Sequence, residues 1–164
     1  MLTSEEYTAL LSQDFLAFTE QVFATVSPGV DYQDNWHIHC IAEHLQAVER
    51  GDMRRLIINM PPRSLKSIEV TIAWTAWLMG KNPSTQIIAA SYSQALSTKH
   101  NVDTRLVMQS DWYKAAFPDT QISVDQNEKQ KFQTTARGHR IATSVGGSAT
   151  GEGGDILIAD DPIK

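Results

Sequence analysis

The sequence predicts an α/β domain built around a mainly parallel central sheet with helices on its flanks. Segments with apolar residues at helical spacing alternate along the chain with short, continuous apolar runs, which are typical of strands buried on both faces. The chain has 164 residues, of which 41% are hydrophobic and 20% are charged. This composition fits one domain of ordinary size with an apolar core.

Residues 1–52 are predicted to form an N-terminal helical segment. A first amphipathic helix is expected over residues 5–25, where a Ser-Pro-Gly sequence follows. A second helix is expected in residues 35–50, with Gly51 as its C-cap. The apolar stripes of these helices consist of Leu11, Phe15, Phe18 and Val22 in the first, and Ile38, Ile41, Leu45 and Val48 in the second.

Residues 53–164 are predicted to form the core of the domain. The strands expected in it are the apolar runs 56–60, 85–93 and 156–160. The helices expected between them cover residues 65–79 and 94–110, with a short turn of helix to Phe117. A hairpin is expected around Arg137 and Gly138.

The run 156–160 is apolar on both faces, so it is expected inside the sheet with a neighbour on each side. Only four residues follow it, too few for a crossover and another strand. We therefore expect a core that is incomplete at its C-terminal end, with one sheet edge uncovered and marginal folding of the isolated chain.

Charge and cysteine content narrow the classes of function. The net charge is −5, and the first Lys or Arg is Arg50. The remaining cations are scattered, so composition alone predicts no strong nucleic-acid surface. A single cysteine, Cys40, makes no internal disulfide and fits a reducing compartment. The sequence has neither a membrane-length apolar run nor the basic start of a signal peptide, which indicates an unexported protein without membrane contact.

The corner at residues 61–67 ends in Lys66-Ser67, between an expected strand and an expected helix. In a phosphate loop, backbone N–H groups wrap the phosphates, the lysine reaches the β and γ oxygens, and the hydroxyl binds Mg²⁺. The two glycine positions of that motif hold Met60 and Leu65. If the second position needs a positive φ, leucine costs about 1–3 kcal/mol there.

A plainer interpretation of the corner stays open at this point. Pro61 and Pro62 would only turn the chain, Ser64 would be the N-cap of the helix, and Lys66 would be solvated. Even so, free N–H groups at the helix start beside Arg63 and Lys66 would attract an anion.

Two adjacent carboxylates end the last apolar run. Asp160 is expected to hold the Mg²⁺ shell, and Asp161 to orient or deprotonate an attacking water. Pro162 is expected to keep Asp161 extended. We predict that the Lys66 amine lies within about 10 Å of the Asp160 carboxylate, since one Mg²⁺ shell must join them. The alternative is a strand that ends in a solvated acidic turn.

Three other patterns in the sequence could suggest a binding site, but each is better explained by a structural role. His37, Cys40 and His44 share a helical face, but no fourth zinc ligand is evident near them. The glycine-rich residues 151–155 precede a strand, whereas a dinucleotide fingerprint follows one, so a flexible turn is expected. The pair Lys129 and Lys131 beside Phe132 is expected to be a solvated strand edge.

Together, these motifs resemble the N-terminal ATPase domain of the large terminase subunit of tailed bacteriophages. The resemblance covers about residues 36–164. The stretches that carry it are "NWHIHCIAEHLQAVERGDMRRLIINMPPRSLKS", "TQIIAASYSQAL", "DWYKAAFP" and "SVGGSATGEGGDILIADDPIK". It implies a P-loop NTPase fold of the additional-strand class, and ATP hydrolysis with Mg²⁺ that drives double-stranded DNA into a procapsid.

The resemblance also implies partners and a location. These are double-stranded DNA, the portal protein, the terminase small subunit and further copies of the chain in an assembled motor. The location is the cytoplasm of a bacterial host that carries the phage or prophage. In the family, a coupling motif and a nuclease domain come after the last residue of this sequence, so the isolated chain is expected to be inactive or very weak.

Family roles transfer to single positions. Lys66 and Ser67 match the Walker A lysine and hydroxyl, and Asp160 matches the Walker B acid. Asp161 matches the catalytic acid, which is more often glutamate. Arg63 falls where the Walker A loop often has an arginine, which makes it a candidate sensor of the γ-phosphate.

The remaining nucleotide-binding candidates surround these residues. Ser64 and Leu65 complete the loop, and Trp36 and His37 match an upstream segment that contacts adenine. Leu65 replaces a common glycine, and Asp161 is one methylene shorter than glutamate, so hydrolysis is expected to be slow or to need a neighbouring subunit. The alternatives are a catalytically silent fragment that retains the fold, a helicase-like ATPase, and a small-molecule kinase, for which no arginine-rich lid is visible.

Overall fold

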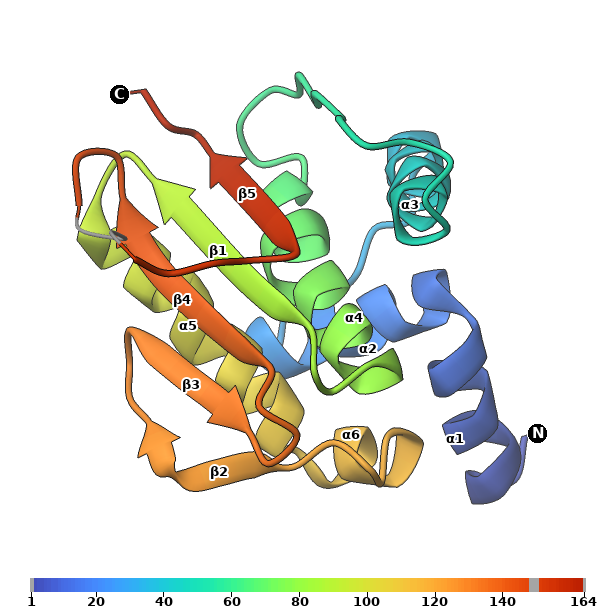
Figure 1. Cartoon of the computed structure of the whole chain (residues 1–164). Coiled ribbons are helices and arrows are strands. Elements are labelled where there is room, and N and C mark those ends of the chain that lie inside the picture. Colours follow the sequence, from blue (N-terminus) through green and yellow to red (C-terminus); the bar gives the residue numbers. More distant parts are fainter. Residues whose placement is uncertain (1, 148–150, 164) are drawn as a thin grey trace.

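Residues 4–26 form two helices where the sequence predicted one over residues 5–25. The computed structural model describes residues 2–147 and 151–163, and Figure 1 draws its helices and strands. Helix α1 (Ser4–Gln13) and helix α2 (Phe15–Val26) are separated at Asp14, whose carboxylate accepts hydrogen bonds from the backbone N–H groups of Leu16 and Ala17. The prediction of a single helix over residues 5–25 is wrong, because the Asp14 cap starts a new helix.

Helix α3 (Trp36–Glu49) confirms the second predicted helix. Its last residue is Glu49 and its C-cap is Arg50, so the prediction of Gly51 as the C-cap is wrong by one residue. Gly51 follows the cap with φ of 82°, a conformation that glycine adopts without steric cost. Within the described residues 2–147 and 151–163, no helix is both long and apolar enough to cross a membrane.

In the described residues the sheet has five strands and is mixed, so the expectation of a mainly parallel sheet is wrong. Its spatial order is β2-β3-β4-β1-β5. The strands are β1 (Gln86–Ser91), β2 (Ile122–Asn127), β3 (Lys131–Thr134), β4 (His139–Ser144) and β5 (Ile156–Asp160). β1 pairs in parallel with β4 and β5, whereas β3 pairs antiparallel with β2 and β4. The α/β class is confirmed.

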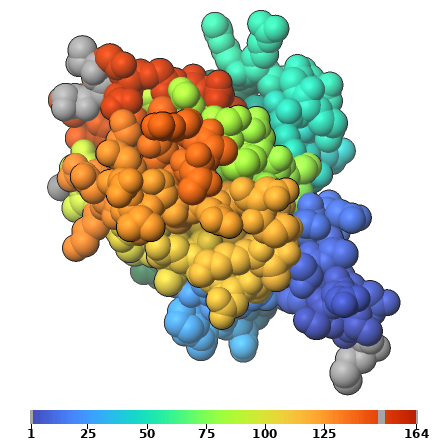
Figure 2. Space-filling view, turned by 60° about the horizontal axis from the view of Figure 1, so that its bottom comes forward, coloured from blue at the N-terminus to red at the C-terminus, as the bar shows by residue number. Residues whose placement is uncertain are grey.

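The antiparallel half comes from the predicted hairpin plus one strand that the sequence did not reveal. β3 and β4 flank Arg137 and Gly138, as predicted. Gly138 leaves no room for a side chain, because an added Cβ would lie 2.2 Å from the carbonyl oxygen of Pro83. β2 was missed because its residues are mostly exposed and polar, which gives no apolar signal. Figure 2 shows the orange surface of this half beside the yellow surface of the segment that precedes it.

The helix after the corner is confirmed, but its first half has an unexpected geometry. Residues Ser67–Ala73 form a π-helix, η1, which continues directly into α4 (Trp74–Lys81). Helices η1 and α5 (Gln94–Gln109) pack against the sheet, and α6 (Asp111–Ala116) follows α5. Wide π turns occur often at functional sites.

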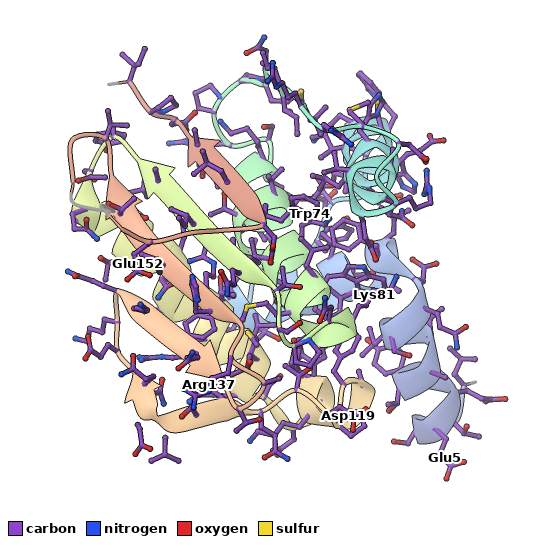
Figure 3. All side chains as sticks on the ribbon, in the orientation of Figure 1. Glu5, Trp74, Lys81, Asp119, Arg137 and Glu152 are labelled. Carbon is purple, nitrogen blue, oxygen red and sulfur yellow. The ribbon has the colours of Figure 1, made fainter. Side chains whose placement is uncertain are left out.

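The core joins the N-terminal helices to the rest of the chain. The ring of Trp77 in α4 makes edge contacts with Phe15 and Phe18 of α2 and with Phe117 after α6. All four side chains are buried. Figure 3 shows side chains crowded between the helices, with Trp74 labelled on the side towards α3. The proposed domain division after residue 52 stays a prediction.

The predicted strand at residues 56–60 does not form. The side chains of Leu56, Ile58 and Met60 are half-buried against the core, while Ile57 is 85% exposed. This alternation is that of an extended chain, but the segment has no ladder partner. A cavity of about 750 Å³, lined by residues 54–59 and 155–162 among others, lies between it and β5.

β5 is an edge strand and not an inner one. It ends the order of the sheet in the described part of the chain, and Leu157 is 75% exposed. The expectation of a strand with neighbours on both sides is therefore wrong, because the segment 56–60 stays apart from it. The uncovered sheet edge expected from the sequence is confirmed in residues 2–147 and 151–163.

Candidate nucleotide-phosphate site

The corner holds two non-glycine residues in the left-handed region. Arg63 has φ of 64° and Leu65 has φ of 62°. The glycine-like demand on position 65 is thus confirmed, and each such residue costs on the order of 1–3 kcal/mol. Residues 60–68 together with Asp161 line a hollow of about 270 Å³, which brings Arg63, Ser64, Leu65, Lys66 and Ser67 to one place.

Lys66 faces the two carboxylates at the end of β5. Its Nζ lies 2.5 Å from Oδ1 of Asp161 and 3.5 Å from Oδ1 of Asp160, and its side chain is 19% exposed. The predicted proximity of Lys66 and Asp160 is confirmed. Burial lowers the pKa of Lys66, but the hydrogen bond to Asp161 and the charges of both carboxylates outweigh it, so the pKa is raised overall.

The plainer interpretation of the corner is wrong on two points. Lys66 is paired instead of solvated. Ser64 does not cap the helix: its Oγ is buried without a hydrogen-bond partner among the described residues, and η1 has no side-chain cap. Instead, the backbone oxygen of Ser64 accepts a hydrogen bond of 3.1 Å from Nε2 of His37. This contact ties α3 to the loop.

His37 therefore reaches the loop, whereas Trp36 is not brought to it, and the contact with adenine implied for His37 stays a prediction. The Trp36 side chain is 76% exposed and lines neither of the two hollows beside the corner. Its proposed contact with adenine stays a prediction.

Asp160 is fixed by the sheet and by buried neighbours. It pairs in register with Ser91 of β1, and its side chain is 5% exposed. Its Oδ2 accepts a hydrogen bond of 3.1 Å from Oγ1 of Thr71 in η1, and Nδ1 of His100 in α5 lies 3.6 Å from the same oxygen. The alternative of a solvated acidic turn is wrong for Asp160, because this carboxylate is buried.

Asp161 differs from its neighbour in exposure and in backbone conformation. Its side chain is 59% exposed, and its φ is 44°, so the predicted extended conformation is wrong. Proline disfavours the right-handed helical region for the preceding residue, and the chain here turns to the left-handed side instead. The N–H of Tyr92 donates to the Asp161 carbonyl (3.1 Å), and Lys66 holds its carboxylate.

A buried guanidinium supports the helix that faces Asp160. Arg140 of β4 is fully buried, and it donates to the backbone oxygen of Thr71 (2.8 Å), to Oγ1 of Thr75 (3.3 Å) and to Oδ1 of Asn101. Burial lowers the pKa of Arg140 to about 9. Arg140 therefore connects η1, α5 and the sheet beneath the site.

Two more buried groups near the site have displaced pKa values. Burial lowers the pKa of His100, and the charge of Asp160 opposes this only in part. Burial also raises the pKa of Glu69 in η1 to about 8, and neither carboxylate oxygen has a hydrogen-bond partner within the described residues. Both shifts favour the uncharged form of the side chain.

Sequence reasoning missed Thr71, His100 and Arg140. Thr71 follows Ser67 by four positions, so helical spacing could have placed both hydroxyls on one side of the predicted helix. His100 and Arg140 come from α5 and β4, and no local signal in the sequence connects them to Asp160.

The oxygen atoms at the site fit a magnesium ion. Asp160 Oδ1 and the Ser67 hydroxyl are hard donors of the kind that Mg²⁺ prefers. No group of three or more His, Cys, Asp or Glu side chains suited to a metal occurs in the described residues. Magnesium bound with nucleotides needs no such cage, since waters and phosphate oxygens complete its shell.

Comparison with known proteins adds no further support. No protein-family model matches this sequence, and a search of curated proteins gives no match either. The resemblance to large terminase subunits therefore stays an expectation drawn from the motifs.

Proposed function

We propose that this chain binds and hydrolyses ATP with Mg²⁺ as the ATPase part of a phage DNA-packaging motor, a large terminase subunit. One observation carries the enzymatic half of the proposal. The Lys66 amine contacts the carboxylates of Asp160 and Asp161, although 95 positions separate Lys66 from Asp161 in the sequence. A lysine and paired acids at the carboxyl end of a strand are the parts that phosphoryl transfer requires.

Each residue has a distinct task in this proposal. Lys66 leaves the carboxylates and binds the β- and γ-phosphates, and backbone N–H groups at the start of η1 contribute further donors. Ser67 and Asp160 Oδ1 would hold Mg²⁺, which offsets phosphate charge when bound. Asp161, released from Lys66 and open to solvent, orients or deprotonates the attacking water.

The motor half of the proposal rests on the family resemblance. It extends to the P-loop fold of the additional-strand class, to double-stranded DNA, portal protein and small subunit as partners, and to the host cytoplasm. A nucleotide-binding chain that does not hydrolyse ATP is the second candidate. The contact between Lys66 and the proposed water-activating Asp161 favours it, because the lysine amine occupies an oxygen of the carboxylate that would act on the water.

The test is nucleotide binding, measured with a fluorescent ATP analogue, together with phosphate release with and without duplex DNA. We expect Lys66→Ala to remove measurable binding, since a charged contact to phosphate contributes about 1.5–3 kcal/mol. We expect Asp161→Asn to keep binding and to remove turnover, because this acid acts only on the water.

Lys114→Ala is the matched control, since Lys114 is exposed on α6 and lines neither hollow beside the corner. It should leave both measurements unchanged. Equal losses of binding in Lys66→Ala and Asp161→Asn would contradict the assigned roles. Binding without any turnover in the unsubstituted chain, even with DNA, would favour the second candidate.

A further inference from the structure

The two oxygens of the Asp160 carboxylate have separate surroundings. Oδ1 faces the site, where Lys66 Nζ lies 3.5 Å away. Oδ2 faces the interior, where Thr71 Oγ1 donates to it at 3.1 Å and His100 Nδ1 lies at 3.6 Å. A carboxylate turns readily about its last side-chain bond, because that torsion has broad minima. The contacts to Oδ2 therefore decide which oxygen faces the site.

Thr71 is held in place from two sides. Its backbone oxygen accepts hydrogen bonds of 2.8 Å from the Arg140 guanidinium and of 2.8 Å from the Thr75 hydroxyl. Its side chain is 2% exposed, so no solvent competes for the hydroxyl. Because η1 is pinned to β4 through Arg140, the Thr71 hydroxyl has a fixed position relative to the sheet that carries Asp160.

His100 is held by a different element. It lies on α5, which is anchored to β1 by a hydrogen bond of 2.9 Å from Ser97 Oγ to the Ala89 carbonyl. Its side chain is 7% exposed, and Nδ1 has no hydrogen-bond partner among the described residues. A shift of a few tenths of an ångström would bring Nδ1 within hydrogen-bond range of Oδ2.

The two supports are joined beneath the carboxylate. The residue after His100, Asn101, accepts a hydrogen bond from Arg140 through Oδ1, and Arg140 donates to Thr71. Contacts thus run from Asp160 to Thr71, to Arg140, to Asn101 and, through α5, to His100. Three separate elements of the fold contribute to this arrangement, and the sequence motifs of the site include none of these supporting residues.

We propose that Thr71 and His100 are positioning residues that hold Asp160 Oδ2 inward, so that Oδ1 alone is presented to the cation in the site. This inference rests on the proposed function, in which that cation is Lys66 in the free chain and Mg²⁺ in the nucleotide complex. A single presented oxygen suits the octahedral shell of Mg²⁺, which takes most of its ligands from water and phosphates. Partners of metal ligands commonly change metal affinity about 10–100-fold.

The test measures nucleotide affinity over a range of Mg²⁺ concentrations and Mn²⁺ binding by electron paramagnetic resonance in the presence of ATP. The variants are Thr71→Val, which loses the hydroxyl at nearly equal shape, and His100→Phe, which loses the ring nitrogens. We expect each to raise the half-saturating metal concentration about tenfold, with nucleotide affinity in the absence of metal unchanged.

Conservative variants distinguish the loss of a positioning contact from a general loss of folding. Thr71→Ser keeps the hydroxyl, and His100→Asn offers an amide nitrogen near the place of Nδ1, so both should restore metal affinity. Thr19→Val is the matched control. Thr19 is buried on α2, and its hydroxyl donates to the Phe15 carbonyl (2.8 Å) within the same helix. It should leave the metal dependence unchanged.

Three results would overturn the inference. Unchanged metal dependence in Thr71→Val and His100→Phe, with ATP still bound, would remove the positioning role and leave the proposed function standing. An equal loss in Thr71→Val and Thr71→Ser would assign the effect to packing. No ATP binding by the unsubstituted chain would overturn the proposed function, and the positioning role with it.

Discussion

Residues 56–60 and strand β5 are apolar runs of equal length that lead into the two halves of the candidate site, and only β5 joins the sheet. β5 pairs with β1 from Ile156 to Asp160. The segment 56–60 is extended and packs Leu56, Ile58 and Met60 against the core, but it forms no ladder. Apolar composition is therefore insufficient to make a strand; the backbone needs a neighbouring strand at the right distance.

The difference between the paired strand β5 and the unpaired segment 56–60 extends into the candidate site. The sheet side delivers Asp160, whose carboxylate is 5% exposed and has buried neighbours. The corner side delivers Lys66 through a loop in which Arg63 and Leu65 both have positive φ. Asp160 is thus held by regular structure, while the phosphate half contains local strain and depends on contacts with α3 and with the carboxylates.

The largest effect is expected when a side chain is truncated in each of the two apolar runs, residues 56–60 and β5. Ile158 of β5 is 7% exposed, and we expect Ile158→Ala to lower the free energy of unfolding by about 2–5 kcal/mol, as for other core truncations. Ile57 is 85% exposed, and Ile57→Ala should change it by less than about 0.5 kcal/mol.

Chemical denaturation of both variants, followed by circular dichroism, measures the two values. Similar losses in both variants would mean that residues 56–60 are buried as deeply as β5, which would remove the distinction between the two halves.

The free energy of unfolding should depend on pH through the corner side of the site, because the helix after the corner carries the buried Glu69. Its pKa in the folded chain is about 8, above the ordinary value of 4.5, so the folded state holds this proton more tightly. The stabilisation from Glu69 is complete below about pH 4.5 and is lost as the pH rises towards 8. The change is on the order of 5 kcal/mol, since one pKa unit corresponds to about 1.4 kcal/mol.

The measurement compares unfolding of the unsubstituted chain with that of Glu69→Gln between pH 5 and pH 9. The variant should lose this pH dependence, because glutamine does not ionise. If the difference between the two curves stays constant over this range, Glu69 is not buried as an isolated carboxyl.

The smallest effect concerns the strain in the corner. Leu65→Gly should stabilise the chain by about 1 kcal/mol, because relief of a positive φ gives about 1–3 kcal/mol and the greater freedom of glycine in the unfolded chain costs about 0.5–1 kcal/mol. Ile57→Gly is the control at a position without a positive φ, and it should be neutral or destabilising. Thermal unfolding of both variants shows whether each substitution stabilises or destabilises the chain. Destabilisation by Leu65→Gly would show that the packing of the leucine side chain contributes more than its backbone strain costs.

Local patterns in the sequence predicted much of the fold. Apolar runs identified β1 and β5, helical spacing and Gly51 identified α3, and the hairpin around Gly138 was found from its flanking segments. These features depend on neighbours in sequence. Three features of the fold differ from the prediction. Asp14 caps a second helix, β2 is polar, and residues 56–60 have no ladder partner among the described residues.

The candidate site divides in the same way. The approach of Lys66 to Asp160 followed from motif chemistry, because one metal shell must join a phosphate-bound lysine and an acid. The left-handed Asp161 did not follow, since the rule for residues before proline excludes the right-handed helix and leaves more than one alternative. Thr71, His100 and Arg140 reach Asp160 only through the packing of η1, α5 and β4, which the sequence does not reveal.

The exposed thiol on α3 offers a way to observe the corner directly. Cys40 is the one cysteine of the sequence, and it lies three positions after His37, whose ring contacts the Ser64 carbonyl. Residues at this spacing are neighbours on a helix surface. A fluorophore or spin label attached to Cys40 would stand beside the loop without removal of any other thiol, so that movement of the corner could be followed as a spectroscopic signal.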